Sequence, residues 1–188
     1  SYKELNLFLI GVGTVGGIFL EQLKNQQEKL FNEQRLKLKL VGVANSKKML
    51  FNREGIDPGN FAVMLNESSS KSGFDTFTDQ MIEMNMFNSV FVDCTANEEL
   101  ANYYHKILDA RISVVAANKV AASSVYSNYK MLKDSAVRKG IKFFFETNVG
   151  AGLPIISTIK DLINSGDKII KIQAVLSGTL NFIFNTLG

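Results

Sequence analysis

A glycine-rich segment carries the clearest chemistry in the sequence. Gly11-Val12-Gly13-Thr14-Val15-Gly16 follows a short apolar run and opens a longer amphipathic one. In such a segment the first glycine allows a tight turn, the second lets a pyrophosphate approach the backbone, and the third lets helix and strand pack closely. The helix that follows offers unpaired N–H groups and a positive dipole end to the phosphates. We expect a dinucleotide to bind here; the alternative is a flexible strand-to-helix turn. The predicted binding residues are Gly11, Gly13, Thr14, Val15 and Gly16.

A second polar segment follows the apolar run 38–44 and reads Asn45-Ser46-Lys47-Lys48, with Arg53 close behind. An NAD-preferring site usually has an acidic residue at this point, which holds the ribose 2′-hydroxyl. A carboxylate would repel a 2′-phosphate, whereas a serine hydroxyl and lysine ammonium groups would favour it. We therefore predict that Asn45, Ser46 and Lys47 bind the cofactor, and that NADP(H) is preferred while NAD(H) can also bind. The alternative is a solvated loop that happens to carry two lysines.

The elements that must position these segments follow a regular pattern. Short apolar runs alternate with longer amphipathic stretches, as in a parallel sheet with crossover helices. The predicted strands cover residues 5–10, 38–44, 89–93, 112–116 and 141–145, and the predicted helices 15–30, 78–85, 98–110 and 123–139. The polar stretch 45–72 reads as a long connection. This order predicts an α/β fold, a Rossmann-type doubly wound parallel sheet, over residues 1–150.

The last part of the chain, residues 151–188, changes character. A helix near 155–164 is followed by an apolar strand at 169–176 and a helical stretch at 180–187. This last strand and helix have no partner layer inside the chain. Because compact domains rarely end on an uncovered apolar element, we expect a linker helix and the truncated beginning of a second domain. The alternative is that both elements pack on the first sheet as edge elements.

Composition excludes several other classes of protein. The chain has 188 residues, of which 46% are hydrophobic and 21% charged, as in globular proteins rather than disordered ones. It has no apolar run near the ~20 residues of a membrane helix, and no signal-peptide pattern. One cysteine cannot form an internal disulfide, which favours the cytoplasm, and one cysteine with one histidine cannot build a usual zinc site. A net charge of +3 gives no argument for a nucleic-acid partner.

Four further segments, in this order after the glycine-rich segment, resemble homoserine dehydrogenase. They are Val92-Asp93-Cys94-Thr95, Ala117-Asn118-Lys119, the stretch 146–154 (ETNVGAGLP) and the stretch 176–183 (LSGTLNFI). The resemblance runs from about Leu7 to the last residue, and the third and fourth segments are its most specific parts. The wording GVANS at 42–46 and the Asp-Cys-Thr triplet look like the version that is fused behind an aspartate kinase. The resemblance thus implies such a kinase domain upstream in the parent protein.

The resemblance implies the NAD(P)H-dependent interconversion of L-aspartate 4-semialdehyde and L-homoserine, on the way to threonine and methionine. It places Thr95 beside the cofactor. It makes Lys119 the active-site lysine, lining the cofactor and substrate region, where its ammonium group could hold a substrate carboxylate or relay a proton. It places Gly178 and Thr179 at the mouth of the substrate site. From spacing alone, Lys119 could equally be a solvated loop residue.

The stretch 146–154 resembles the family's monovalent-cation loop. Carried over, the sodium ligands would be the Glu146 side chain with the backbone carbonyls of Val149, Ala151 and Leu153. This set is chemically reasonable, because a hard cation takes oxygen ligands and glycines let carbonyls turn inward. The alternative is a glycine-rich hinge between domains, with Glu146 solvated.

The resemblance also implies what would lie beyond residue 188. In the family, the substrate-binding acidic residues and the lysine assigned as proton donor come from a Gly-Tyr-Thr-Glu-Pro-Asp-Pro region and a later Asp-rich helix. We therefore expect this chain to bind NADP(H) but to reduce the semialdehyde poorly or not at all. The family's second domain, for substrate binding and dimerisation, would begin within 151–188, so we expect a homo-oligomer, with 169–176 as an exposed strand prone to association.

Two other functions use the same residues differently. A noncatalytic redox-sensing module would also need the glycine-rich segment, but not the substrate-side segments. A semialdehyde dehydrogenase would use Cys94 as a nucleophile that forms a thioester, and it would need a base such as His105 nearby. Nothing in the sequence brings those two side chains together. We expect Cys94 to be a small buried residue at a strand end and His105 to be partly exposed on a helix.

Overall fold

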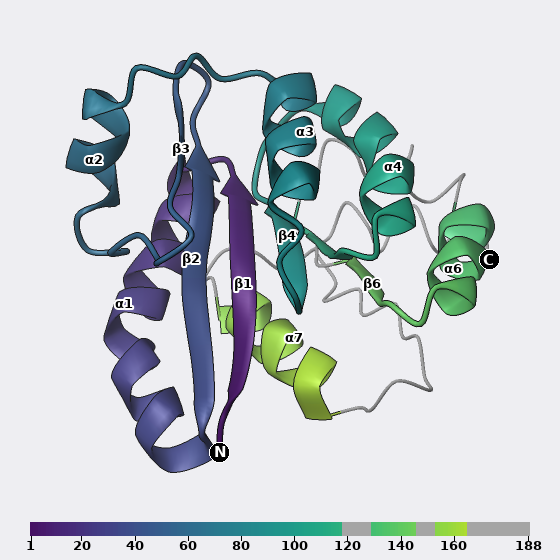
Figure 1. Ribbon diagram of the computed structural model, residues 1–188, viewed down its shortest axis with the longest axis horizontal. Helices are drawn as coiled ribbons and strands as arrows, with labels where there is room; N and C mark the ends of the chain where they lie inside the picture. Colours follow the sequence, from purple (N-terminus) through teal and green to yellow (C-terminus); the bar gives the residue numbers. More distant parts are fainter. Residues whose placement is uncertain (118–128, 146–152, 165–188) are drawn as a thin grey trace.

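A six-stranded sheet in the order β3-β2-β1-β4-β5-β6 forms the centre of the molecule (Figure 1). The computed structural model describes residues 1–117, 129–145 and 153–164. Their elements are, in chain order, β1 (Lys3–Ile10), α1 (Thr14–Gln34), β2 (Leu36–Ala44), β3 (Met49–Phe51), α2 (Phe61–Glu67), α3 (Phe74–Met84), β4 (Ser89–Asp93), the 3-10 helix η1 (Glu98–Tyr103), α4 (Tyr104–Asp109), β5 (Ser113–Ala116), α6 (Tyr129–Arg138), β6 (Phe143–Phe145) and α7 (Leu153–Asn164).

Among the strands that the structure describes, the sheet is parallel from β2 to β6, and only β3 runs antiparallel, against the end of β2. The strand order reverses between β1 and β4, which both lie in the middle of the sheet. The last six residues of β1 are all buried, because helices cover this strand on both faces. The predicted doubly wound α/β fold is therefore confirmed, with one antiparallel strand added at its edge.

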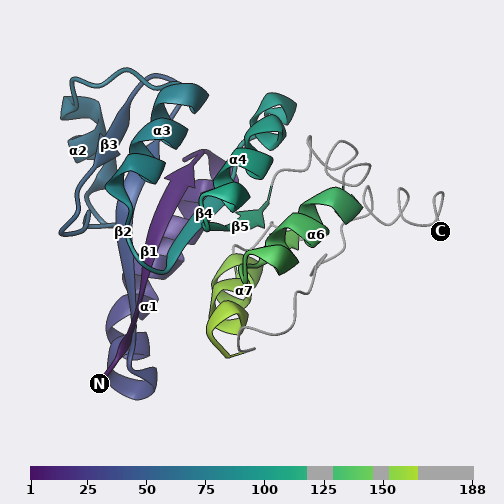
Figure 2. The same ribbon diagram turned by 45° about the vertical axis from the view of Figure 1, so that its right-hand side comes forward.

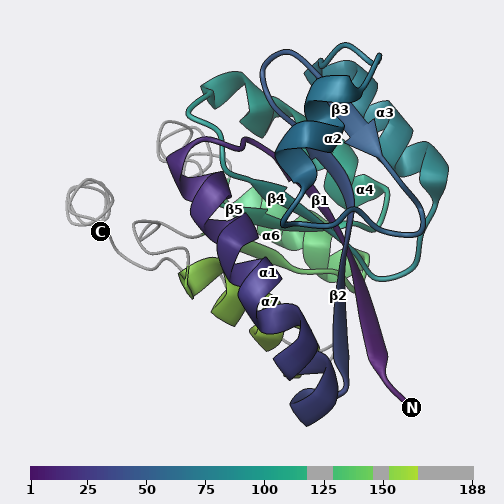
Figure 3. The same ribbon diagram turned by 90° about the vertical axis from the view of Figure 1, so that its left-hand side faces the viewer.

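Helices cover both faces of the sheet, and alternate residues of β1 point to each face. Leu7 and Leu9 pack with Phe19 and Leu23 of α1, and Ile159 of α7 belongs to the same cluster. The turned views in Figures 2 and 3 show α1 and α7 together on this face. The opposite face carries α3, α4 and α6, whose apolar side chains include Phe77, Met81, Tyr104, Ile107 and Leu132.

Helix α7 lies after the predicted domain boundary at residue 150, yet it packs on the sheet of the first domain. Ile155, Ile156 and Ile159 are buried in the same cluster as the β1 side chains. The division into residues 1–150 and 151–188 stays a prediction. The strand expected at 169–176 and the helix expected at 180–187 lie outside the described residues.

The stretch 45–72 differs from the expected long connection, because it contains β3 and α2. The side chain of Asn45 explains the turn into β3: its Oδ1 accepts hydrogen bonds from the backbone N–H of Lys47 at 2.8 Å and of Lys48 at 2.7 Å. Helix α3 also begins earlier than expected, at Phe74 instead of residue 78. Within the described parts of the chain, no helix has the length and apolar character needed to cross a membrane.

Candidate functional site

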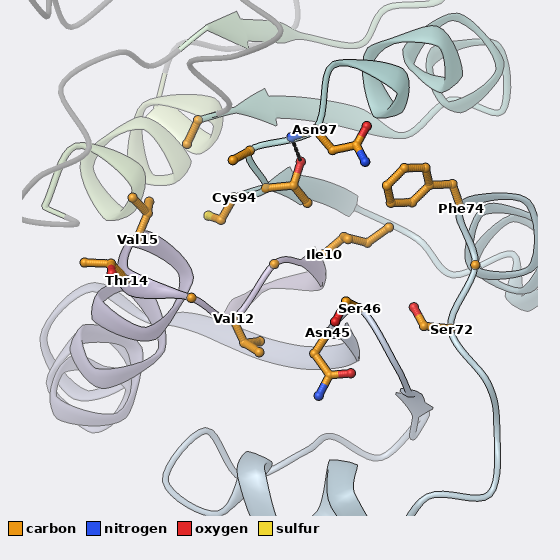
Figure 4. A pocket seen from close by; sticks show the side chains of 16 residues that line it. Ile10, Val12, Thr14, Val15, Asn45, Ser46, Ser72, Phe74, Cys94 and Asn97 are labelled. Atoms are coloured by element: carbon orange, nitrogen blue, oxygen red, sulfur yellow. Dashed lines mark hydrogen bonds between the residues drawn. The ribbon is translucent and has the colours of Figure 1, made fainter.

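A pocket of about 950 Å³ lies beyond the carboxyl ends of β1, β2, β4 and β5 (Figure 4). This is the crevice at the point where the strand order reverses, the usual ligand site of an open α/β sheet. The described residues that line it are Ile10, Gly11, Val12, Gly13, Thr14, Val15, Asn45, Ser46, Ser72, Gly73, Phe74, Cys94, Thr95, Ala96, Asn97 and Ala117. None of these lining residues is acidic or basic, so hydrogen-bonding groups and the backbone supply its polarity.

At two positions of the glycine-rich segment, neighbouring backbone leaves no room for a side chain, and at a third position it does. Gly11 has a φ of 103°, and a Cβ placed there would lie 2.6 Å from the carbonyl carbon and oxygen of Cys94. A Cβ on Gly16 would lie 1.8 Å from the carbonyl oxygen of Gly11. By contrast, a Cβ on Gly13 would meet no described atom within 4 Å beyond its chain neighbours. Gly11 and Gly16 therefore close the turn, while Gly13 leaves open space.

The N-terminus of α1 faces this open space. Gly13 is the N-cap residue, and no side chain of the described residues accepts the cap hydrogen bond. The first N–H groups of a helix have no intrahelical carbonyl to bind, and the helix dipole is positive at this end. Thr14 and Val15 form the first turn and line the pocket. The arrangement suits a phosphate group, because backbone N–H donors and the dipole both attract negative charge.

The end of β2 forms a second wall of the pocket. Asn45 and Ser46 line it, whereas Lys47 is exposed and does not. The other basic side chains of this region are directed elsewhere: Lys48 Nζ donates to the carbonyl oxygen of Asn66 at 2.6 Å, and Arg53 Nη2 to that of Met84 at 2.8 Å. Of the three basic residues expected near the cofactor, Lys47 is therefore the one whose side chain makes neither of these backbone contacts.

The end of β4 forms the wall that faces the glycine-rich segment. Asp93 is fully buried, and its Oδ1 accepts hydrogen bonds from the Thr95 N–H and the Thr95 hydroxyl, both at 2.8 Å. Its Oδ2 accepts a hydrogen bond from the hydroxyl of Tyr104, a fully buried residue of α4. Burial, and then the negative charge of Asp93, raise the pKa of the Tyr104 phenol well above its usual value, so this hydroxyl stays protonated and donates.

Cys94 and His105 do not form a nucleophile and its base. Cys94 is buried, and burial together with the charge of Asp93 raises the pKa of its thiol well above the ordinary value. A neutral thiol is a poor nucleophile, since the thiolate is the reactive form. His105 lies on α4 with its Nδ1 3.4 Å from the Asp109 carboxylate, and both side chains are partly exposed. These environments favour the expected structural role for Cys94.

Comparison with known proteins identifies the family. Residues 11–146 match the sequence model described as the NAD binding domain of homoserine dehydrogenase, and residues 154–188 match that of homoserine dehydrogenase itself. The chain belongs to the homoserine dehydrogenase family. Residues 11–146 match the NAD binding domain of that family, which indicates a nicotinamide dinucleotide as its cofactor.

Several homoserine dehydrogenases and bifunctional relatives resemble the chain over 98% of its length. It is 39% identical to bifunctional aspartokinase/homoserine dehydrogenase 1 of Arabidopsis thaliana, a chloroplastic protein, and covers 20% of it. It is 32% identical to the homoserine dehydrogenase of Schizosaccharomyces pombe and covers 50% of it. A hyperthermophilic archaeal homoserine dehydrogenase, solved in complex with NADPH, has the same fold, with a TM-score of 0.61 at 21% identity over 83% of this chain and 48% of that one. The chain thus spans between a fifth and half of these proteins.

The remaining residues that the homoserine dehydrogenase resemblance singled out lie mostly outside the described residues. These are Lys119, Glu146, Val149, Ala151, Gly178 and Thr179. Leu153, the last predicted sodium ligand, is the first residue of α7. Among the described residues there is no group of three or more His, Cys, Asp or Glu side chains that could hold a metal ion.

Sequence reasoning missed part of the lining of this pocket. Ser72, Gly73 and Phe74 line the pocket where α3 begins, and Asn97 lines it beyond Thr95. A Ser-Gly pair before an amphipathic stretch is a signal for a helix start, but the expected start at residue 78 placed it inside a loop. Asn97 has a clearer signal, because an asparagine just before a helical stretch is a typical N-cap residue. In the structure its Oδ1 accepts from the Glu99 N–H at 2.8 Å at the start of η1.

Proposed function

We propose that this chain is the cofactor-binding part of a homoserine dehydrogenase that uses NADP(H) in preference to NAD(H). The whole protein would interconvert L-aspartate 4-semialdehyde and L-homoserine. The observation that carries the proposal is the pocket at the sheet's reversal point, with the glycine-rich segment open at Gly13 and no acidic residue at the end of β2. The curated relatives, which carry this activity in their names, support the reaction.

The residues present fit a dinucleotide. The backbone N–H groups of residues 13–16, at the start of α1, would hold the pyrophosphate. Asn45 and Ser46 would face the adenosine ribose, and Thr95 would lie across the pocket from them, toward the nicotinamide half. When bound, the nicotinamide supplies the hydride, and the chain's own part is to bind and orient the ring and to limit access of water to it.

Two lysines support the preference for a 2′-phosphate. Lys47 is exposed beside Ser46, and its carbonyl oxygen accepts from the Ser72 N–H at 3.0 Å. This contact, with the bridge between Lys48 and Lys71, brings the exposed Lys71 to the same rim. Two ammonium groups at the edge of a pocket whose described lining has no acidic residue would attract the additional phosphate of NADP(H).

Fluorescence titration with the two reduced cofactors tests the preference. A hydrogen bond to a charged group contributes about 1.5–3 kcal/mol, so we expect NADPH to bind at least about tenfold more tightly than NADH. Lys47→Glu should remove most of this difference by weakening NADPH alone. Lys29→Glu, the same charge change on an exposed residue of α1, is the matched control and should leave both affinities unchanged. Tighter binding of NADH by the unmodified chain would contradict the proposal.

Lys119 would carry the substrate-side chemistry, either holding the substrate carboxylate or relaying a proton. In the full-length protein, Lys119→Ala should lower turnover roughly a hundredfold or more, which is the usual loss for a positioned acid–base group. The measurement is steady-state reduction of the semialdehyde, with thermal unfolding followed by circular dichroism as the control for folding. Turnover equal to that of the unmodified enzyme would remove Lys119 from the active site.

Further parts of the proposal concern the whole protein. The names of the bifunctional relatives support an aspartate kinase fused upstream, and the homoserine dehydrogenase model matched by 154–188 supports a substrate domain that begins there. The full-length protein would form homo-oligomers through that domain.

A sodium ion would be held by Glu146 and the carbonyls of Val149, Ala151 and Leu153. Replacing sodium by lithium in an activity assay of the full-length enzyme would test the ion.

A further inference from the structure

A buried polar cluster lies directly behind the wall of the pocket at the end of β4. Asp93 and Tyr104 are both 0% exposed, and Tyr104 otherwise belongs to the apolar cluster of α3, α4 and α6. Burying a carboxylate costs several kcal/mol unless hydrogen bonds replace its water. An aliphatic side chain would fill the same place without this cost. Because the cluster lies directly behind the pocket wall, its hydrogen bonds can hold that wall in place.

The hydrogen bonds converge on the Asp93 carboxylate, from Tyr104 on the helix side and from Thr95 on the pocket side. The Tyr104 hydroxyl donates to Asp93 Oδ2, and Asp93 Oδ1 accepts from the N–H and the hydroxyl of Thr95 at 2.8 Å each. The Thr95 hydroxyl oxygen in turn accepts from the Asn97 N–H at 3.3 Å. Two residues that line the pocket, Thr95 and Asn97, are thus held by a carboxylate whose other oxygen is fixed by Tyr104.

The turn held in this way lies against the glycine-rich segment. A Cβ on Gly11 would be 2.6 Å from the Cys94 carbonyl carbon and oxygen and 2.9 Å from the Thr95 nitrogen. The backbone of residues 94–95 therefore lies closer to Gly11 than a residue with a Cβ would allow. Figure 4 shows Cys94 and Asn97 on the side of the pocket opposite Asn45. Any displacement of this turn changes the width of the pocket on the β4 side.

We propose that Tyr104 is a positioning residue of the dinucleotide site: through Asp93 it holds the turn at Thr95 in its binding geometry before the cofactor arrives. This inference rests on the proposed function, because it takes the pocket to bind NADP(H). The adenosine half of the cofactor faces the end of β2, and the nicotinamide half faces the ends of β4 and β5. The hydroxyl of Tyr104 therefore contributes to binding of the nicotinamide half and not of the adenosine half.

Tyr104→Phe tests this, because it removes one hydroxyl and keeps the ring. If the turn then occupies its binding geometry a tenth of the time, the apparent Kd for NADPH rises about tenfold. The Kd for adenosine 2′,5′-bisphosphate, which is the adenosine half alone, should stay within about twofold of its original value, because that half does not face the turn at Thr95. Tyr2→Phe, the same change on an exposed side chain that packs on Phe31 and does not line the pocket, should leave both affinities unchanged.

The outcomes separate the two proposals. If the unmodified chain binds neither ligand, the proposed function fails and this inference fails with it. If the unmodified chain binds NADPH and Tyr104→Phe binds it equally well, or loses affinity for both ligands to the same extent, the positioning role is wrong and the proposed function stands. Each titration is made well below the melting temperature of the variant, so that a loss of stability alone does not change the ratio of the two affinities.

A second measurement needs no variant and so does not depend on whether Tyr104→Phe folds. Amide hydrogen exchange of the unmodified chain, without cofactor, reports whether the turn is already held. Thr95 and Asn97 donate their N–H groups within the cluster, and both should exchange slowly before NADPH is added. Fast exchange of both amides that becomes slow only with NADPH would overturn the proposal, because the cofactor and not Tyr104 would then order the turn.

Discussion

Gly13→Ala leaves the chain folded but removes most of its affinity for NADPH. In the folded protein the added methyl group meets no described atom within 4 Å beyond the chain neighbours, and the φ of Gly13, −74°, does not lie in the left-handed region that favours glycine. Replacing a glycine N-cap by alanine costs at most about 1 kcal/mol of stability. The methyl group does occupy the space through which a pyrophosphate approaches the backbone. We expect the Kd for NADPH to rise roughly a hundredfold, or about 2.8 kcal/mol.

Two measurements on the same sample check this result. Thermal unfolding by circular dichroism should give a Tm within a few degrees of the original, and NADPH fluorescence titration should give the weakened Kd. Gly17→Ala is the matched control, because its added Cβ lies 3.9 Å from the nearest carbonyl oxygen, that of Val12, in ordinary contact. It should keep the affinity, since Gly17 lies one turn into α1. A Gly13→Ala chain that binds NADPH as tightly as before would place the pyrophosphate elsewhere.

Much of the fold could be predicted because central parallel strands are short apolar runs. The predicted strand 89–93 has the bounds of β4, since Asn88 and Cys94 flank five residues that are all buried. The antiparallel β3 could not be predicted in the same way. It has only three half-buried residues, and its place depends on the hairpin that the Asn45 side chain closes. A three-residue strand has no periodicity to detect, and the turn chemistry reads equally well as a loop.

The candidate site was predictable where one segment forms it and not where the fold assembles it. The glycine-rich segment combines strand, turn and helix start in adjacent residues, so its local pattern is sufficient. Phe74 reaches the pocket because α3 begins beside the end of β2, which depends on tertiary structure. Tyr104 has the spacing of an ordinary apolar helix position, and its partner Asp93 is 11 residues earlier. No local pattern distinguishes a buried tyrosine that donates to a carboxylate from one that only fills the core.

Gly16→Ala should have the opposite effect from Gly13→Ala: the chain loses much of its stability, and cofactor binding weakens only as a consequence. The added Cβ would lie 1.8 Å from the carbonyl oxygen of Gly11 and 2.7 Å from its carbonyl carbon, and both atoms are backbone. A flexible side chain could move away from such a contact, but here α1 would have to separate from the end of β1. Overpacking, with the side-chain and backbone shifts that it forces, costs about 1–3 kcal/mol and occasionally more, and a Cβ at 1.8 Å from a backbone oxygen belongs at or beyond the upper end of that range.

The expected loss for Gly16→Ala is therefore more than about 3 kcal/mol, from a total stability that for a domain is about 5–15 kcal/mol. Urea unfolding followed by circular dichroism measures it, with Gly17→Ala as the neighbouring helix control, which should be as stable as the original or slightly more so because alanine favours a helix interior. A Gly16→Ala midpoint equal to the original would mean that α1 and β1 are not in contact at this glycine. If instead Gly16→Ala unfolds and Gly13→Ala only loses NADPH, the glycine-rich segment has two separable tasks, closing the strand-to-helix turn and leaving room for the pyrophosphate.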